Sequence, residues 1–322
     1  MTLSQMQVFN EYVMPATIET LAQMVEQFNA ASAGSIVLTT AGFDGDFLQE
    51  SFFQAIHTAQ RRVDRYAAQG TPSATDLTEL KHSGVKIAGG FGPIRFEPSQ
   101  LTWLQRPTQQ GIEVASRNFA EALLQDQLNT AIAALVAAIS NQATAVNDVS
   151  EDSPPATVTY GVLNGAHAKF GDHSGSIVAN VMSGMMFHEL IGQNLSNAAR
   201  LFTAPNVNIV DILGKSVIVT DAPALSPPSP AKNVVLGLVN GAATVYDGGD
   251  VISNVDTVNG KTRIETTMQV DYSFGLALRG YSWNESAGGR SPDDSDLTTG
   301  SNWTKVATSI KHTAGVAAIG VA

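Results

Sequence analysis

The tightest group of side chains that could bind a metal ion or catalyse hydrolysis lies between residues 167 and 189. It contains three histidines and two carboxylates: His167, Asp172, His173, His188 and Glu189. The run H-E-L-I-G that starts at His188 begins like the zinc-binding H-E-x-x-H pattern but lacks its second histidine. His188 and Glu189 are consecutive on an expected helix, so they point about 100° apart and cannot chelate one ion. We therefore expect capping or core histidines, with a metal or hydrolase site as a minor alternative.

Two glycine-containing segments are similar to catalytic or phosphate-binding loops without completing either pattern. Residues 171–175, GDHSG, carry serine at the wrong position for a G-x-S-x-G nucleophile elbow. Residues 89–92, GGFG, are followed neither by Lys-Ser/Thr nor by a helix pattern, and a phosphate-binding loop requires both. We expect residues 89–92 to form a turn at the tip of an arm.

The remaining residues that could do chemistry give no site either. Trp103 and Trp283 are expected to be buried or interface aromatics. The acidic residues near the C-terminus do not have the spacing of a calcium loop: Glu285, Asp293, Asp294 and Asp296. The absence of cysteine excludes disulfides, thiolate zinc sites and iron–sulfur clusters. The sequence therefore predicts no catalytic residue, no cofactor and no bound metal.

Composition indicates a soluble chain with few charges. Only 15% of the 322 residues are charged, against about 25% in a typical soluble domain. Protein interfaces are depleted in charge, so self-association is expected. The net charge of −11 argues against a protein that coats DNA through Lys and Arg. We expect no signal peptide and no membrane span, because the most apolar run, residues 131–139, is far shorter than the about 20 residues that a span needs.

Apolar residues at helical spacing predict the elements that must position these side chains. Helices are expected at residues 1–30, 47–56, 112–140 and 174–202. The helix at 112–140 is the clearest, since an apolar stripe runs through an Ala-rich segment that would extend about 40 Å as a spine. The last helix is expected to bury Ile177, Val181, Met185 and Leu190.

Strands are predicted at residues 35–40 and through the C-terminal half. Residues 207–225 are expected to form a hairpin around Gly214, and residues 233–247 a second hairpin around Asn240-Gly241. Residues 263–278 alternate between apolar even positions and polar odd positions. This pattern predicts a strand about 50 Å long with one buried face and one wet face.

The stretch between residues 57 and 106 has too many glycines and prolines for a compact core and is expected to be an extended two-stranded excursion. From Arg61 to Arg106 it carries seven basic and four acidic residues, a charge of +3, which leaves −14 for the rest of the chain. A basic arm on an acidic body predicts that charge steers docking.

The order of these elements resembles that of the major capsid protein of tailed bacteriophages, the Hong Kong ninety-seven type fold. The local sequences most similar to that family are VANVMSGMMFHELIGQNL at residues 178–195, VNIVDILGKSVIVTDAPAL at 207–225 and LGLVNGAATVYDGGD at 236–250. The resemblance implies an α+β fold with an N-terminal arm (1–56), an extended E-loop (57–110), a P-domain spine helix (111–160), an A-domain (161–250) and a P-domain long strand with the C-terminal segment (251–322).

The resemblance also implies a role and partners. The chain would self-assemble into pentamers and hexamers of an icosahedral shell that encloses double-stranded DNA without sequence-specific binding, working with a scaffolding protein, a portal and decoration proteins. The E-loop would lie over a neighbouring subunit. Its basic and aromatic residues are the expected intersubunit contacts: Arg61, Arg62, Arg65, Lys81, Lys86, Arg95 and Trp103.

Two alternatives remain open at the level of sequence. An encapsulin-like nanocompartment has the same fold and would differ in its cargo. A surface-layer or adhesin subunit would suit the low charge and the Thr and Asn content, but the missing signal peptide and the long helix at 112–140 argue against it.

Overall fold

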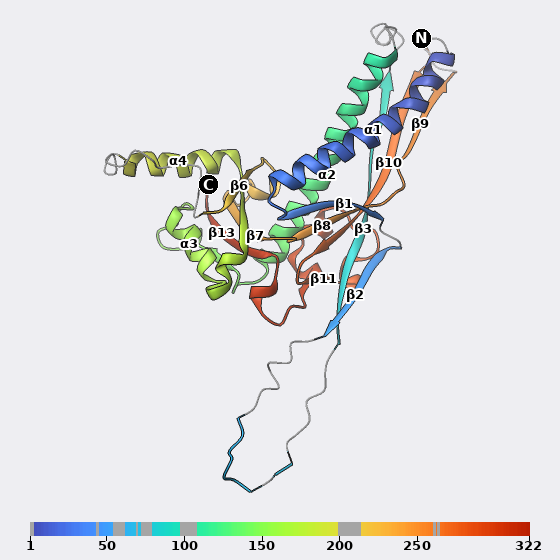
Figure 1. Cartoon of the computed structure of the whole chain (residues 1–322). Helices are drawn as coiled ribbons and strands as arrows, with labels where there is room; N and C mark the ends of the chain where they lie inside the picture. Colours follow the sequence, from blue (N-terminus) through green and yellow to red (C-terminus); the bar gives the residue numbers. More distant parts are fainter. Residues whose placement is uncertain are drawn as a thin grey trace.

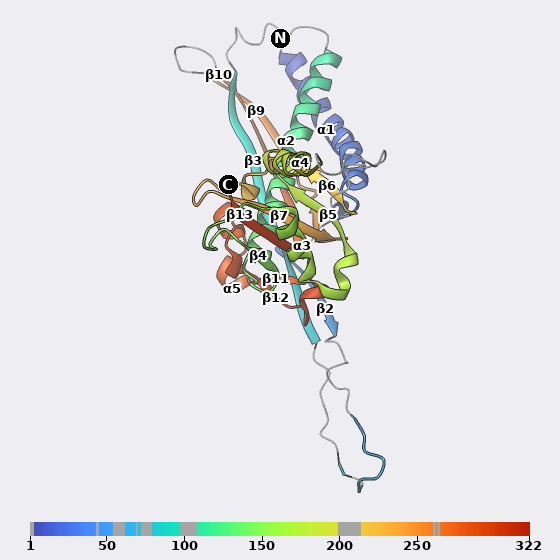
Figure 2. The same ribbon diagram turned by 90° about the vertical axis from the view of Figure 1, so that its left-hand side faces the viewer.

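Two β-sheets and two long helices form a mixed α+β structure (Figure 1). The computed structural model describes residues 3–42, 45–53, 62–68, 70–71, 79–96, 108–198, 214–259, 262 and 265–322. Long strands run beside the two long helices, while a second sheet with shorter helices lies to one side (Figures 1 and 2). The α+β class expected from the sequence is confirmed.

The larger sheet is organised around β10 (Glu265–Leu278). One edge of β10 pairs antiparallel with β3 (Glu79–Phe96), and the other edge pairs with β9 (Ile252–Val258) and then with β8 (Ala243–Asp247). The other described strands of this eight-stranded sheet are β1 (Ile36–Gly42) beside β8, β2 (Phe47–Phe53) beside β3, β11 (Tyr281–Trp283) and β12 (Trp303–Lys305).

The predicted alternation of residues 263–278 is confirmed in the N-terminal half of β10, where Val270 is buried and Asp271 is exposed. In the C-terminal half the wet face is absent, because Ser273 and Ala277 are buried as well. These side chains are small, and backbone lies close to each of them. Gly248, just after β8, donates its N–H to Ser273 O over 3.1 Å, and a Cβ at Gly84 of β3 would lie 3.2 Å from the Cβ of Ala277. The expectation of one wet face was therefore wrong for this half of the strand.

The smaller sheet has the strand order β4 (Val146–Asp148), β13 (Gly315–Val321), β7 (Lys232–Val239), β5 (Ile177–Met182) and β6 (Ser216–Val219). The short helices around it are α3 (Tyr160–Ala168), η3 (Gly171–Ser176), α4 (Gly184–Ala198) and η4 (Pro223–Leu225). Its central strand β7 is buried from residue 233 to residue 239, as expected for a strand covered on both faces.

The hairpin expected around Asn240-Gly241 was wrong. β7 belongs to the smaller sheet and β8 to the larger one, so the turn carries the chain between sheets. Gly241 adopts φ +64°, and its N–H donates to Gly34 O over 2.8 Å. The turn chemistry was as predicted, but its backbone partner is Gly34, in the turn between α1 and β1, rather than an opposing strand. The first strand of the other expected hairpin, residues 207–213, lies outside the described residues.

Two predicted helices also differ from the structure. Residues 47–53 form β2, which pairs antiparallel with β3 along its whole length. In the segment 174–202, residues 177–182 form β5 and the helix begins only at Gly184. Ile177 and Val181 are buried as expected, but on a strand. Short apolar runs fit either element, and the available strand partner decides between them.

Residues 89–92 lie within β3 and do not form the expected turn. Gly89 lies beside Tyr272 of β10, where a Cβ would be 2.8 Å from the tyrosine ring. Gly92 has φ +107° at an irregularity in the pairing with β10. The glycines therefore allow close approach of an aromatic ring and a bulge, which are two known uses of glycine in strands.

The helices α1 (Leu3–Ala31) and α2 (Thr108–Ser140) confirm the first and third predicted helices. At about 1.5 Å per residue, α2 extends about 50 Å. Its C-terminal half contacts both sheets and is part of the main hydrophobic core. Among the described helices, the part of α2 at 117–140 is long and apolar enough to cross a membrane, with a mean hydropathy of 1.4, but 56% of that stretch is buried inside the protein, as in a core helix.

Short elements complete the C-terminal segment: α5 (Glu285–Gly288), α6 (Asp294–Leu297), η5 (Gly300–Asn302) and η6 (Ile310–His312). The side chain of Asp293 caps α6 by accepting from Asp296 N, and the side chain of Asp296 in turn accepts from Asp293 N. Two of the acidic residues considered for calcium therefore form a capping box.

We expect Tyr272→Phe to lower the free energy of unfolding by about 1–2 kcal/mol. Tyr272 is buried in β10, and its hydroxyl donates to Asp126 Oδ2 of α2 over 2.6 Å. Loss of the hydroxyl leaves the half-buried carboxylate without this donor. Denaturant unfolding of the unassembled chain measures the change. The matched control is Tyr66→Phe at a side chain that is 98% exposed; equal effects from the two variants would contradict the prediction.

Candidate assembly surfaces

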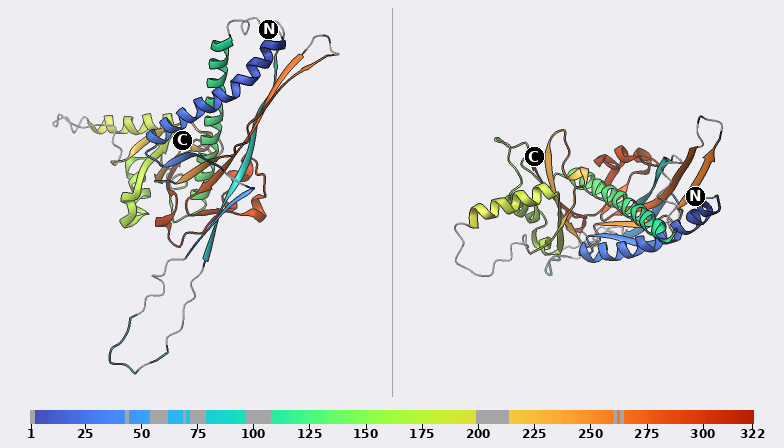
Figure 3. Two further views of the ribbon diagram at one scale, coloured as in Figure 1. Left: turned by 45° about the vertical axis from the view of Figure 1, so that its right-hand side comes forward. Right: turned by 90° about the horizontal axis from the view of Figure 1, so that it is seen from above.

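The ribbon formed by β2 and β3 extends past the body of the molecule (Figures 1 and 3). β2 ends at Phe53 and β3 begins at Glu79; we call residues 54–78, which connect them, the overhang. Its described residues, 62–68 and 70–71, lie far from both sheets, and every one of them is exposed.

The described tip of the overhang presents an aromatic side chain to solvent. Tyr66 is 98% exposed and Val63 is 66% exposed. Tyr66 N donates to Asp64 Oδ1 over 2.9 Å, so an Asx-type bond holds the backbone that presents the ring. Aromatic side chains that become buried on binding are common anchors of protein interfaces.

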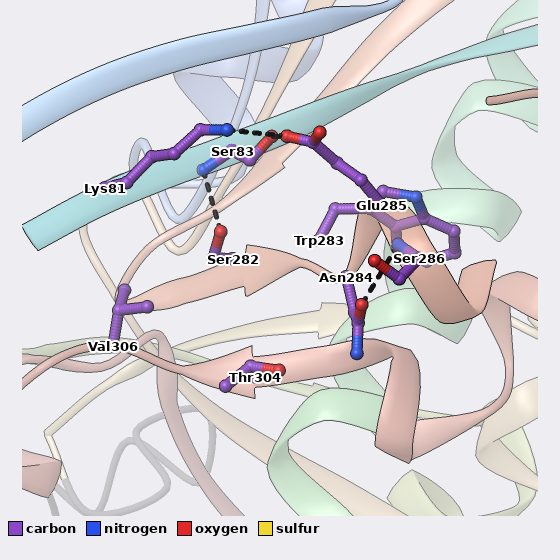
Figure 4. Close-up of a pocket in the computed structure, with 9 residues that line it drawn as sticks. All are labelled: Lys81, Ser83, Ser282, Trp283, Asn284, Glu285, Ser286, Thr304 and Val306. Atoms are coloured by element: carbon purple, nitrogen blue, oxygen red, sulfur yellow. Dashed lines mark hydrogen bonds and ion pairs between the residues drawn. The ribbon is translucent and has the colours of Figure 1, made fainter. Parts of the chain in front are cut away.

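The base of the overhang is attached to the body through Glu285 at the start of α5 (Figure 4). Its Oε1 accepts from Lys81 Nζ over 2.8 Å, and from Ser83 Oγ and Gln49 Nε2 over 3.2 Å each. The bond from Lys81 is the main reason why the pKa of this carboxyl is lowered. Both strands of the ribbon are therefore bonded to one carboxylate, which fixes the direction in which the ribbon leaves the body.

A cavity of about 410 Å³ lies beside this attachment (Figure 4). Its lining includes the hydroxyls of Ser282, Ser286 and Thr304, and neither histidine nor cysteine is among the lining residues. Glu285 is the only carboxylate among them, and its lowered pKa makes it a weak base. The cavity therefore lacks an activated nucleophile and is best understood as part of the ribbon's attachment.

The basic residues predicted as intersubunit contacts fall into separate groups. Arg62 and Arg65 are exposed on the overhang. Three others lie on β3 and form ion pairs within the chain: Lys81–Glu285 at 2.8 Å, Lys86–Asp250 at 3.3 Å and Arg95–Glu265 at 3.6 Å. Arg61 and Trp103 lie outside the described residues. The five described residues do not form one patch, because β3 spreads its three basic residues along its length.

A second cavity, of about 490 Å³, lies where β8 ends and β9 begins. β3 contributes Ala88, Gly89 and Gly90 to its lining, and Asp271, Tyr272 and Ser273 come from β10. The remaining two lining residues are Asp250 and Ile252. We call this cavity the acidic groove, because it combines two carboxylates with small or exposed apolar residues.

The histidine and carboxylate cluster that the sequence suggested does not come together. His167 is 6% exposed, its Nε2 lies 2.9 Å from Asn180 Oδ1, and a Cβ at Gly237 would lie 2.9 Å from the same nitrogen. Asp172 pairs with Lys311, and His188 is exposed on α4. Within the described ranges, no three His, Asp or Glu side chains are placed to hold a metal ion. His167 is thus a core histidine, which is one of the two roles expected for the histidines of this cluster.

We expect the free energy of unfolding to fall as the pH drops below about 6.5, and His167 to be one cause. Burial lowers the pKa of His167, so the unfolded chain binds this proton at a higher pH than the folded chain does. As the pH falls, the free energy of unfolding begins to decrease near the pKa of His167 in the unfolded chain, and this decrease ends once the pH is below the pKa of His167 in the folded chain. Denaturant unfolding between pH 7.5 and 5 should show a smaller slope for His167→Gln. The exposed control His188→Gln should keep the original slope; an unchanged slope in His167→Gln would contradict the assignment.

The smaller sheet has an apolar edge. β6 is the last described strand on that side, and it ends in Val219, which is 46% exposed. Met185, at the start of the neighbouring α4, is 71% exposed, so the expectation that it is buried was wrong. α4 projects away from the sheet (Figure 1). Unpaired strand edges with exposed apolar residues favour contact with another chain.

Comparison with protein families identifies the chain. The model of the Gp13-like family, described as major capsid protein 13-like, matches residues 5–317. The chain belongs to this family of major capsid proteins. It is therefore a structural shell protein of the phage head, located in the virion capsid, as the sequence predicted.

The chain of this family member is also similar in structure to solved phage proteins. The capsid asymmetric unit of cyanophage Pam1 is 12% identical, with a TM-score of 0.50 over 76% of this chain and 84% of that chain. A solved structure of Mycobacterium phage Adephagia is 11% identical, with a TM-score of 0.49 over 88% of this chain and 87% of that chain. The Pam1 likeness supports the expected Hong Kong ninety-seven type fold. A comparison with curated proteins gives no match.

Sequence reasoning missed the two residues that define the overhang of this capsid protein. Glu285 was considered only as a calcium ligand, and its partner Lys81 lies 204 positions away. Tyr66 follows three arginines in a polar segment, a context that also fits an ordinary loop. The position of this tyrosine among charged and turn-forming residues could have indicated an exposed contact residue. Only its exposure in the structure distinguishes it from a core residue.

Proposed function

We propose that the chain builds its shell from pentamers and hexamers in which the overhang of each copy lies on a neighbouring copy. The observation that carries this proposal is the described tip, where Tyr66 is 98% exposed on a segment far from both sheets. A segment held at its base by Glu285 and exposed at its tip is suited to reach another subunit.

The proposal assigns a role to each region expected from the sequence: N-arm (1–56), E-loop (57–110), P-domain (111–160 and 251–322) and A-domain (161–250). Within 57–110, residues 85–96 pair with β10 in the larger sheet, so the reaching role belongs to the overhang. The exposed edge at Val219 and Met185 supports contacts between A-domains around the symmetry axes.

The shell that we propose encloses double-stranded DNA without sequence-specific binding. A net charge of −11 supports this, since tight binding would need many Lys and Arg on phosphates. A scaffolding protein, a portal and decoration proteins complete the head. The role that we propose for the chain is structural, supported by its membership of a family of major capsid proteins. An encapsulin-like shell is distinguished by protein cargo in place of DNA.

Electron microscopy of the expressed full chain, alone and with its neighbouring reading frames, tests the proposal. We expect uniform closed particles, with pentameric and hexameric units in averaged images. Replacing residues 57–76 by a short Gly-Ser linker should leave far-UV circular dichroism nearly unchanged and abolish closed particles. A matched control, Arg117→Ala with Glu121→Ala, removes an exposed ion pair of α2 and should assemble normally. Equal particle yields with and without the overhang would refute the proposal.

A further inference from the structure

The acidic groove lies open on the body of the molecule. Gly90 and Ala88 contribute no bulky side chain to its floor, and the carboxylate of Asp271 lies close to Gly90, where a Cβ would be 2.8 Å from Asp271 Oδ1. Ile252 on the wall of the groove is 67% exposed. An exposed isoleucine beside a floor of small residues offers an apolar surface to a flat side chain. The groove is therefore able to receive a ring from another molecule.

The groove carries an excess of negative charge. Asp250 pairs with Lys86 over 3.3 Å. The two carboxylate oxygens of Asp271 accept from the neutral amide Nε2 of Gln269 over 3.0 and 3.3 Å. Among the described residues, no lysine or arginine forms an ion pair with Asp271. One carboxylate of the groove is thus available to a cation from outside.

The tip of the overhang has the complementary features. Arg62 and Arg65 are exposed and form no ion pair with the described part of the chain, and Tyr66, which is also exposed, directly follows Arg65 in the sequence. Tyrosine and arginine are, with tryptophan, the residue types enriched among those that dominate binding energy at interfaces.

The groove that receives a tip belongs to a different copy. Gly90 lies 11 residues after the start of β3 at Glu79, about 36 Å along the strand from the base of the overhang. The described tip extends from that base in the opposite direction (Figures 1 and 3). The tip and the groove lie in opposite directions from the base of the overhang, so the tip of one copy can contact the groove of the next in a head-to-tail arrangement. Such contacts form a closed ring when the rotation between neighbouring copies closes the circle.

The cavity of Figure 4 is the other possible receptor, and its chemistry is less suitable. Its carboxylate, Glu285, already accepts from three donors. Its Lys81 has a side chain that is 53% exposed and would repel the arginines of the tip. Charge complementarity therefore favours the acidic groove.

We propose that Tyr66 inserts into the acidic groove of a second copy of this chain, with Arg62 and Arg65 facing its carboxylates. This inference rests on the proposed function, in which the overhang lies on a neighbouring copy. Tyr66 supplies the apolar contact with Ile252 and the small-residue floor, while the arginines orient the tip toward Asp271.

Site-directed crosslinking tests the contact, because the chain contains no cysteine. One chain carries Tyr66→Cys and a second carries Asp271→Cys, and both are co-expressed so that shells contain both. We expect oxidation of assembled shells to give a covalent dimer on a non-reducing gel, with a short bismaleimide as a longer-reach crosslinker. Shells with only one of the two variants should give no dimer. Val63→Cys with Ile252→Cys replaces this pair if either variant blocks assembly.

The control pairs Tyr66→Cys with Ser286→Cys, in the cavity of Figure 4, and should give no dimer. Closed shells in which neither groove pair crosslinks, or in which the Ser286 pair crosslinks equally well, would overturn the acidic groove as receptor while leaving the overhang's role intact. A wild-type chain that forms no shells under any condition would instead remove the proposed function. Tyr66→Ala should slow assembly at least tenfold, and Tyr66→Phe should retain most of the rate.

Discussion

Reversing Arg61, Arg62 and Arg65 to glutamate together is expected to slow shell assembly at least about tenfold, or to abolish it, without unfolding the subunit. Arg62 and Arg65 are exposed on the overhang, so their replacement disturbs no described core contact. The local charge changes by six units, from three positive to three negative side chains, on a chain whose net charge is −11. The reversed tip would then be repelled by the acidic body of its neighbour.

Light scattering at several salt concentrations measures this effect. Screening shortens the range of charge interactions to about 3 Å at 1 M salt, so wild-type assembly should slow as salt rises, whereas the reversed variant should be less impaired at high salt than at low salt. Lys311→Glu is a suitable control, since it reverses an exposed charge that pairs with Asp172 away from the overhang. Wild-type kinetics that stay constant from low to high salt would disprove charge steering.

Trp303→Ala should lower the free energy of unfolding by about 3–5 kcal/mol. Trp303 is fully buried, its ring meets that of Trp283 edge-on with centroids 4.8 Å apart, and its Nε1 donates to Leu297 O over 3.0 Å. The substitution leaves a large cavity and an unpaired carbonyl beside α2. Such a loss is a large part of the about 5–15 kcal/mol that stabilises a typical domain.

Urea unfolding of the unassembled subunit, at a concentration too low for assembly, separates this loss from the stabilisation that neighbouring subunits supply. Trp303→Phe should recover part of the loss, because a phenyl ring refills much of the cavity but makes no hydrogen bond to Leu297. Ile18→Ala, at a side chain that is 55% exposed on α1, should change stability by no more than about 0.5 kcal/mol. A Trp303→Ala effect as small as that of Ile18→Ala would contradict the packing described.

Local pattern predicted the elements that are long and regular. The apolar stripe at 112–140 appears as α2 at 108–140, and the alternation at 263–278 appears as β10 at 265–278. Long periodic segments are predictable because many residues repeat the same burial pattern, so a single exception changes little. The order of such elements was also sufficient to suggest the phage capsid family, which the family match confirms.

Short segments were not predictable, because their conformation depends on partners far along the chain. Residues 47–53 form a strand since β3 pairs with them, and residues 89–92 remain extended since Tyr272 of β10 packs over Gly89. The Asn240-Gly241 turn was recognised, but the strands on its two sides join different sheets. A turn signal describes only the local backbone and carries no information about which strand lies opposite.

For the candidate assembly surface too, part could be predicted from the sequence and part depends on the fold. Composition and charge sums need no coordinates, so a charge-poor, cysteine-free, acidic chain with a basic arm is evident from the residues alone. Which basic residues are available to a partner depends on the fold. β3 places Lys81, Lys86 and Arg95 against carboxylates of the same chain. Arg62 and Arg65, like Tyr66, remain exposed. These ion pairs join residues that are far apart in the sequence: Lys81 and Glu285 are separated by 204 positions and meet only when the ribbon packs on α5.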